Sequence, residues 1–264
     1  MIAAIPFEPI RQIMLGPLTV RTFGTLVAIG FAVAYVAARR DIRRQKLDVA
    51  AFESLFLWMV LGGLVGARLL YVALNFDLYS NPIDILKVWE GGLVSYGGLL
   101  GGATAAWLYI RRKRLAFWLY ADRLAPFIFL GWSFGRLGDF LSGQLVGVPS
   151  DLPWAVQTAG DLPRHPVQIY AALLLFSLFL IVRGLQRYLT RRQLKLPRGS
   201  IALAALGFYG IYRFLIEFLR DYPNSEYLFE YRTFSQGVSL GLLLLALAGL
   251  WWKYRRQARP RWGA

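Results

Sequence analysis

Residues 131–147, GWSFGRLGDFLSGQLVG, place two opposite charges near the end of an otherwise apolar segment. Arg136 and Asp139 are three residues apart, a spacing that brings side chains together on one face of a helix. Charged side chains inside lipid normally face a partner or a water-filled cavity. These two residues alone leave two interpretations open: an ion pair that neutralises itself, or part of a polar site.

A second charged set lies in YGIYRFLIEFLRD, where Arg213, Glu217 and Arg220 share a single helical face. Together with Arg136, Asp139 and Arg68, which lies in GGLVGARLLY, these residues comprise four arginines and two carboxylates. An excess of buried guanidinium groups is unfavourable unless an anion completes the set, and arginine can donate two parallel hydrogen bonds to a phosphate. We expect a phospholipid headgroup here; the alternative is an internal salt-bridge network that only locks the helices.

The elements that carry these charges are expected to be transmembrane helices. Of the 264 residues 57% are hydrophobic and 17% are charged, which is typical of a polytopic helical membrane protein. Several apolar segments approach the ~20 residues that span a bilayer, and in lipid each must satisfy its own backbone hydrogen bonds. We predict an all-α fold with seven transmembrane helices at residues 20–38, 54–74, 93–110, 121–141, 167–182, 201–218 and 234–252.

Basic residues are concentrated in alternate connections between these segments. RRDIRRQK follows the first segment, RRKR the third, residues 183–198 the fifth and KYRRQARPR the seventh. Cytoplasmic loops carry such an excess of lysine and arginine, so we predict a cytoplasmic C-terminus and an N-terminus outside. The net charge of +15 therefore indicates membrane topology and no nucleic-acid partner.

The outer face then receives the N-terminal tail and the loops at residues 75–92, 142–166 and 219–233. Loop 142–166 contains four prolines and cannot form one helix, so we expect a small irregular periplasmic head there. The first residues lack a charged region followed by a long apolar core, which predicts no cleaved signal peptide. The expected organisation is a single transmembrane domain, 1–264, with a periplasmic insertion around 142–166.

Several blocks resemble, in the same order, those of the prolipoprotein diacylglyceryl transferase family of the bacterial inner membrane. GRLGDFLSGQLVG is similar to the family signature, an Arg-x-Gly-Asn-Phe-x-Asn-Gly-Glu core that ends at a glycine three residues after the glutamate. GARLLYV, VWEGGLVSYGGLLGG, RHPVQIYAALL, YGIYRFLIEFLRD and SQGVSL resemble its other blocks. The resemblance implies transfer of diacylglyceryl from phosphatidylglycerol to the lipobox cysteine of a preprolipoprotein, near the periplasmic side, with no metal or soluble cofactor.

The resemblance also implies roles for individual residues. The residues that bind the phosphate in the family are retained here as Arg68, Arg136, Arg213 and Glu217, with Gly147. The chain departs from the family pattern at Phe23 (tyrosine in the family), Tyr96 (histidine), Asp139 and Ser142 (asparagines) and Gln144 (glutamate). We predict that the catalytic residues are Tyr96, Arg136, Asp139, Arg213 and Glu217. We predict that the substrate-binding residues are Arg68, Arg136, Gln144, Gly147, Arg213 and Arg220.

The chemistry needs a cysteine thiolate, because a thiol is a poor nucleophile. One route gives the thiol proton to Asp139, although Arg136 beside it favours the ionised carboxylate. In the other, which we prefer, the arginine surplus favours the thiolate and Tyr96 donates a hydrogen bond to the departing phosphate. The single histidine, His165, is either a base or a structural hydrogen-bonding residue.

Two further functions stay open because of the substituted positions. One is a degenerate paralogue that binds phospholipid or lipoprotein without transfer, and the other is a related transferase with a different acceptor. A seven-helix photoreceptor would need a lysine in segment 234–252, which has none. A transporter would show inverted repeats or helices broken at the midplane, and the sequence indicates neither. We expect the protein to be a monomer.

Overall fold

The computed structural model of the chain describes residues 4–15, 18–79, 81–87, 91–144, 147–221, 227–229 and 232–258. The chain divides into two compact units. The larger unit comprises Met1–Ala38 and Trp118–Ala264, and the smaller unit comprises Arg39–Phe117. The single domain expected for residues 1–264 stays a prediction.

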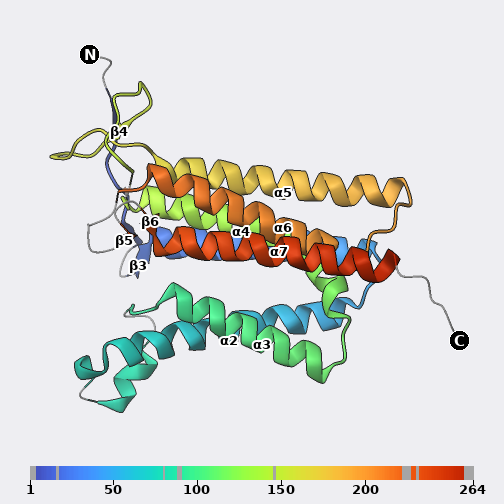
Figure 1. Cartoon of the computed structure of the whole chain (residues 1–264). Helices are drawn as coiled ribbons and strands as arrows, with labels where there is room; N and C mark the ends of the chain where they lie inside the picture. The colour runs from blue at the N-terminus through green and yellow to red at the C-terminus, as the bar shows by residue number, and fades with distance from the viewer. Residues whose placement is uncertain are drawn as a thin grey trace, which may run out of the picture. The chain divides into compact units, whose positions relative to one another are not determined.

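The described residues form seven α-helices, one at each predicted apolar segment (Figure 1). They are α1 (Thr22–Arg44), α2 (Val49–Leu74), α3 (Ser95–Arg112), α4 (Phe117–Leu141), α5 (Val167–Arg191), α6 (Ser200–Ile216) and α7 (Phe234–Ala258). Five of the described helices are long and apolar enough to cross a membrane: α1, α2, α5, α7, and α6 together with the 3-10 turn η4 (Glu217–Leu219). The chain is therefore a multi-pass helical membrane protein.

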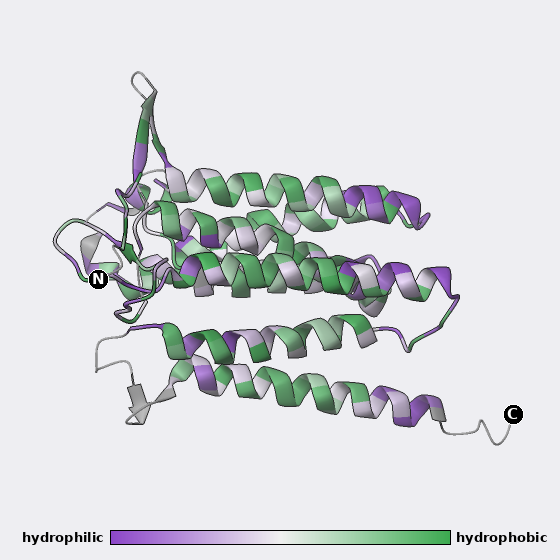
Figure 2. Cartoon of the chain, turned by 90° about the horizontal axis from the view of Figure 1, so that it is seen from above, coloured by the Kyte–Doolittle hydropathy of each residue, from purple (hydrophilic) through white to green (hydrophobic). Residues whose placement is uncertain are grey.

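Helix α5 is longer than the apolar segment 167–182 that predicts it. It continues to Arg191 because its last turns are held by polar contacts. Gln186 donates from Nε2 to the Asp122 carbonyl at 2.6 Å and accepts from Arg183 Nη1 at 2.7 Å. The pattern of apolar residues alone does not predict that the helix extends beyond residue 182. Figure 2 shows that α7 likewise changes from hydrophobic (green) to hydrophilic (purple) residues toward the C-terminus.

In the smaller unit, α2 and α3 pack along a glycine seam formed by Gly62, Gly66, Gly97 and Gly101. A Cβ on Gly66 would lie 2.4 Å from the carbonyl oxygen of Gly97, and one on Gly101 would lie 2.2 Å from that of Gly62. The backbones thus meet without intervening side chains, as small residues allow in membrane helices. Two short 3-10 helices, η1 (Phe76–Leu78) and η2 (Pro82–Leu86), lie between α2 and α3 in the chain.

The core of the larger unit is formed by α4, α5 and α6. Its buried apolar side chains are Ala125, Phe129, Val167, Ala171, Leu175, Val182, Ala205, Tyr212 and Ile216. Helix α1 approaches α4 closely, since a Cβ on Gly30 would lie 2.6 Å from the carbonyl oxygen of Gly131. This packing sets the end of α4 beside the start of α5 and the end of α6, where the predicted site residues lie.

The connection between α4 and α5 forms a head, defined as residues 147–166, that contains no helix, as predicted. Its strand β4 (Val156–Gln157) pairs in parallel with β1 (Ile5–Pro6) near the N-terminus. Val156 also forms an antiparallel bridge with Arg164, which closes the head on itself. The pairing with β1 joins residues 151 positions apart, so no local pattern predicts it.

Two short hairpins complete the described strands of the larger unit. Strands β2 (Gln12–Leu15) and β3 (Leu18–Arg21) pair antiparallel and lead directly into α1. Strands β5 (Tyr227–Phe229) and β6 (Arg232–Thr233) pair in the same way and lead into α7. Each hairpin therefore precedes a helix that packs near the site.

Candidate active site

A partly open cavity lies between the ends of α4 and α6 and the start of α5. Its lining residues are Arg136, Asp139, Gln144, Val167, Gln168, Tyr212, Arg213, Ile216 and Arg220. Five of these, Arg136, Asp139, Gln144, Arg213 and Arg220, are residues that the sequence predicts for the site. The structure thus brings together the charged groups of the two stretches at residues 131–147 and 213–220.

Arg136 and Asp139 lie one turn apart near the end of α4 and form an ion pair, with 2.9 Å between Nη1 and Oδ2. Gly143 ends the helix with φ +83°, a left-handed conformation that glycine adopts freely. Gln144 N then donates to the Asp139 carbonyl at 3.0 Å. The ion pair therefore lies at a fixed helix end.

Arg213 and Glu217 form a close ion pair on α6 and η4. Glu217, only 3% exposed, also accepts a 2.7 Å hydrogen bond from Thr233 Oγ1. Arg213 reaches the first turn of α7, where its Nη2 donates to Ser235 Oγ at 3.0 Å. These contacts fix the guanidinium of Arg213 at the wall of the cavity, with Glu217 behind it.

Gln168 and Tyr212 line the cavity, although the sequence analysis does not single them out. Gln168 lies in the first turn of α5, and its Nε2 donates to the backbone carbonyl of Gln144. Its Oε1 is buried and has no hydrogen-bond partner among the described residues. Their positions in the sequence are the one signal that could have pointed to them, because Gln168 lies within RHPVQIYAALL and Tyr212 immediately precedes Arg213.

Gly147 does not line the cavity, but it leaves no space for a side chain. A Cβ there would lie 2.0 Å from the carbonyl oxygen of His165. Gly147 also bridges antiparallel to Arg220, and Val148 N donates to the Leu219 carbonyl at 3.0 Å. Its substrate-binding role stays a prediction, and the visible function of the glycine is close packing of three segments.

Among the described residues, the charged side chains at the cavity do not balance. Three guanidinium groups, of Arg136, Arg213 and Arg220, meet the two carboxylates of Asp139 and Glu217. In addition, the buried Nε of Arg136 has no hydrogen-bond partner among the described residues. A partly buried surplus of positive charge is costly by itself, so the arrangement suits an anion.

Arg68 and Tyr96 belong to the smaller unit. The guanidinium of Arg68, 7% exposed, donates to the carbonyls of Asp84, Ile85, Gly91 and Gly92 at 2.8, 2.7, 2.6 and 3.1 Å. Tyr96 lies in the first turn of α3, with its side chain 66% exposed. Arg68 thus binds the main chain within η2 and at the two glycines that shortly precede α3. The roles of Arg68 and Tyr96 toward a substrate stay predictions.

Phe23, in the first turn of α1, packs against α4 beside the ion pair. A Cβ on Gly138, the residue before Asp139, would lie 3.3 Å from Phe23 Cα. The aromatic position that departs from the family pattern is therefore a neighbour of the site. The hydroxyl that tyrosine would carry there is absent.

Comparisons with known proteins cover most of the chain. The model of the family described as prolipoprotein diacylglyceryl transferase matches residues 11–252. A phosphatidylglycerol–prolipoprotein diacylglyceryl transferase of Pseudomonas fluorescens is 36% identical, over 96% of this chain and 96% of its own. Proteins of the same name from Bordetella parapertussis and Solidesulfovibrio magneticus are 36% and 37% identical, over 93% and 95% of this chain and 94% and 95% of theirs.

Proposed function

Because the chain belongs to the prolipoprotein diacylglyceryl transferase family, we propose that it transfers diacylglyceryl from phosphatidylglycerol to the lipobox cysteine of a preprolipoprotein. The family assignment predicted from the blocks of sequence is confirmed, and a transferase agrees with the names of the relatives. The single structural observation that supports the reaction is the cavity with its surplus of arginine. A phosphodiester in that cavity would supply the missing negative charge.

In the proposed reaction the cysteine thiolate attacks the glycerol carbon that carries the phosphate. A carbon–sulfur bond forms, the carbon–oxygen bond to the phosphate breaks, and glycerol phosphate leaves with the bonding electrons. Negative charge therefore grows on the departing phosphate. Guanidinium groups held in a cavity stabilise such a charge without having to reorganise, which is the role proposed for Arg136 and Arg213.

The buried polar atoms of the cavity agree with the headgroup of phosphatidylglycerol. Arg136 Nε needs an acceptor and Gln168 Oε1 needs a donor. A phosphate oxygen is an acceptor, and a hydroxyl of the terminal glycerol is a donor. Glu217 would act indirectly, by orienting Arg213. Gln144, whose main-chain carbonyl binds Gln168, would complete the headgroup subsite together with Arg220.

Two ways of forming the thiolate remain in the proposal. Asp139 lines the cavity and would take the proton in one of them. In the other, the arginine surplus lowers the free energy of the thiolate, and Tyr96 donates to the departing phosphate. The second is preferred, because Asp139 is already bound to Arg136 at 2.9 Å, so that taking the thiol proton would break this ion pair.

The proposal includes seven spans in the bacterial inner membrane, an outer N-terminus, a cytoplasmic C-terminus, an active site near the periplasmic side and a monomer. The alternation of basic loops supports this orientation. Since the chain has no cysteine, single cysteines at Asp151 and Gln193 provide a direct test. An impermeant thiol reagent added from outside should label the first and not the second. Equal labelling of both would contradict the topology.

The transfer is tested with purified protein, phosphatidylglycerol and a lipobox peptide, followed by mass spectrometry of the peptide. The expected product carries diacylglyceryl in a thioether at its cysteine. The substituted positions Tyr96, Asp139 and Gln144 keep a second candidate in view, a paralogue that binds the lipid without transfer. Retention of phosphatidylglycerol without any thioether product would favour that candidate over the transferase.

A further inference from the structure

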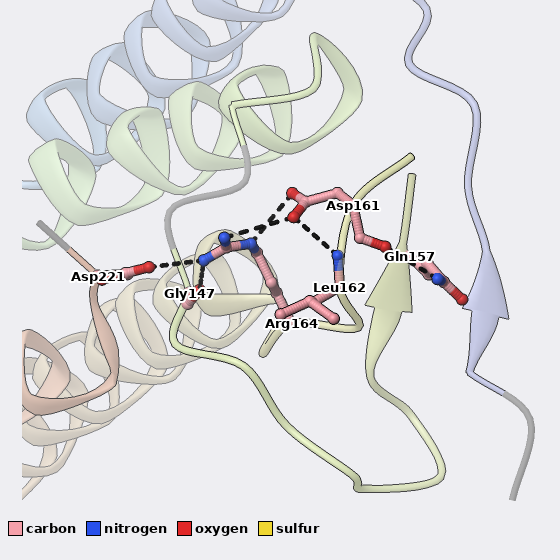
Figure 3. Close-up of polar contacts among 6 residues, drawn as sticks. All are labelled: Gly147, Gln157, Asp161, Leu162, Arg164 and Asp221. Atoms are coloured by element: carbon pink, nitrogen blue, oxygen red, sulfur yellow. Dashed lines mark hydrogen bonds and ion pairs between the residues drawn. The ribbon is translucent and has the colours of Figure 1, made fainter. Parts of the chain in front are cut away.

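Arg164 joins the head to both chain segments that leave the cavity (Figure 3). Its Nη1 donates to the carbonyl of Gly147 at 3.0 Å and to Oδ2 of Asp221 at 2.7 Å. On its other side, Nε donates to Oδ2 of Asp161 at 3.1 Å. The same guanidinium therefore holds one segment after α4, one after η4 and one within the head.

Two of the three held segments, those of Gly147 and Asp221, are close in the chain to a lining residue of the cavity. Gly147 lies three residues after Gln144, and Asp221 directly follows Arg220. Arg164 itself lies four residues before Gln168, at the start of the segment that enters α5. The main chains agree with this arrangement, since Gly147 bridges to Arg220 and His165 N donates to the Val148 carbonyl at 3.1 Å.

We propose that Arg164 is a positioning residue of the active site, whose guanidinium sets the places of Gln144, Gln168 and Arg220 at the cavity. It does not line the cavity, so it acts on the substrate only through these neighbours. The inference rests on the proposed function, because the effect concerns how the cavity binds phosphatidylglycerol.

The two sides of the guanidinium differ in what they reach. Asp161 caps a turn inside the head, where its Oδ1 accepts from Leu162 N at 2.7 Å and its carbonyl accepts from Gln157 Nε2 at 2.9 Å. No lining residue of the cavity is next to it in the chain. Asp221 and Gly147, by contrast, are both bound to segments of the site. Each aspartate forms one ion pair with Arg164, but only Asp221 links Arg164 to a segment of the site. A substitution of Asp161 is therefore a matched control for one of Asp221.

The test measures initial rates of purified variants at a temperature well below unfolding, with phosphatidylglycerol varied and the peptide saturating. For Arg164→Gln we expect KM for phosphatidylglycerol to rise about tenfold, as for loss of one hydrogen bond from a charged group. Asp221→Asn should raise KM in the same direction by a smaller factor, and Asp161→Asn should leave it within twofold. Arg164→Lys keeps the charge and one donor direction, so it should lie between wild type and Arg164→Gln.

A purely stabilising role predicts a different result. It would lower the fraction of active protein, and hence the maximal rate, while KM stays at the wild-type value. That outcome, or equal effects of Asp161→Asn and Asp221→Asn, would overturn the proposal. If Arg164→Gln does not fold, the milder Asp221→Asn decides alone.

A lipid-binding measurement separates this inference from the proposed function. Phosphatidylglycerol retained by wild type and by Arg164→Gln is counted by native mass spectrometry. Wild type that yields no thioether would remove the transferase assignment, whereas weaker lipid retention by Arg164→Gln than by Asp161→Asn would still support positioning. Equal retention in the two variants would contradict it.

Discussion

Two polar clusters on helix α4 of the larger unit can be compared, one around Asp122 near the start of the helix and one around Arg136 near its end. At the first place the charged side chain is matched, since both oxygens of its carboxylate accept a hydrogen bond. The Asp122 carboxylate accepts from Gly199 N at 2.5 Å and from Ala202 N at 2.8 Å. Its carbonyl accepts from Gln186 Nε2 at 2.6 Å. One acidic residue thus joins α4 to the start of α6 and to α5.

At the second place the described charged groups at the cavity are not matched, since Arg136, Arg213 and Arg220 meet only Asp139 and, behind Arg213, Glu217. Arg136 Nε also lacks a partner among the described residues. The two clusters lie on the same helix, roughly 20 Å apart for 14 residues at ~1.5 Å each. Their difference teaches that a charge in a membrane segment is not by itself a sign of function. The completeness of its hydrogen bonds separates a structural lock from a site.

The largest effect on the rate is expected from removing an arginine of the cavity. Arg136→Ala and Arg213→Ala should each lower the rate of transfer by about 100- to 1,000-fold, as for loss of a donor that stabilises charge in a transition state. Both should weaken retention of phosphatidylglycerol, measured by mass spectrometry of the purified protein. Arg192→Ala, an exposed arginine outside the cavity, is the control and should retain both properties. Unchanged lipid retention in both cavity variants would indicate a structural network instead.

Asp122→Ala tests the matched cluster. It leaves two main-chain N–H groups at the start of α6 without their acceptor, at about 1–3 kcal/mol each. We expect a lower thermal midpoint and an unchanged KM for phosphatidylglycerol. Asp122→Asn keeps one acceptor oxygen and should be less destabilising. A changed KM in a still-folded Asp122 variant would contradict the view that the Asp122 cluster is structural and the Arg136 cluster is the site.

Tyr96→Phe tests the catalytic role predicted for Tyr96. If the hydroxyl donates to the phosphate only in the transition state, its loss should cost about 1.5–3 kcal/mol, or roughly ten- to a hundredfold in rate. Single-turnover rates of wild type, Tyr96→Phe and Asp139→Ala provide the measurement. Tyr96→His would introduce an imidazole that titrates near ~6.5 and accepts a proton at neutral pH. An active wild type whose rate neither Tyr96→Phe nor Asp139→Ala changes would exclude both residues from the chemistry.

The smallest effect is expected from acid acting on the head. The Arg164 guanidinium, with a hydrogen bond from Leu162 N, holds the pKa of Asp161 below its usual range. Its stabilisation is therefore complete above the unfolded pKa near ~3.9 and is lost as pH falls through the lower folded value. Solvent screening of this exposed pair keeps the contribution below about 1 kcal/mol. Thermal midpoints between pH 5 and pH 3 should show a slightly shallower decline for Asp161→Asn than for wild type.

The helices and much of the site are predictable from the sequence because both depend on short-range patterns. Apolar runs near the thickness of a bilayer locate all seven helices. The spacings place Arg136 with Asp139, and Arg213 with Glu217, on one helical face, where the structure shows two ion pairs. Contacts between distant segments carry no such pattern. The pairing of β1 with β4 and the cavity positions of Gln168 and Tyr212 therefore emerge only from the structure.

Arg68 illustrates the limit of reasoning from charge alone. Its sequence context, an arginine in an apolar segment, predicts a phosphate ligand as readily as it predicts a structural residue. The structure shows four hydrogen bonds to main-chain carbonyls within the smaller unit. Whether a guanidinium serves a ligand or the backbone depends on the path of a loop, which the sequence does not determine locally.

Glycine has no side-chain rotamers to immobilise, so the pairing of α2 with α3 along the glycine seam loses little side-chain entropy. The attraction comes instead from many close contacts between backbone atoms, each weak and all dependent on the same short separation. A gap opened at one point of the seam would weaken its neighbours at Gly62, Gly66, Gly97 and Gly101 together. The two helices should therefore separate as one cooperative event, without gradual fraying from either end.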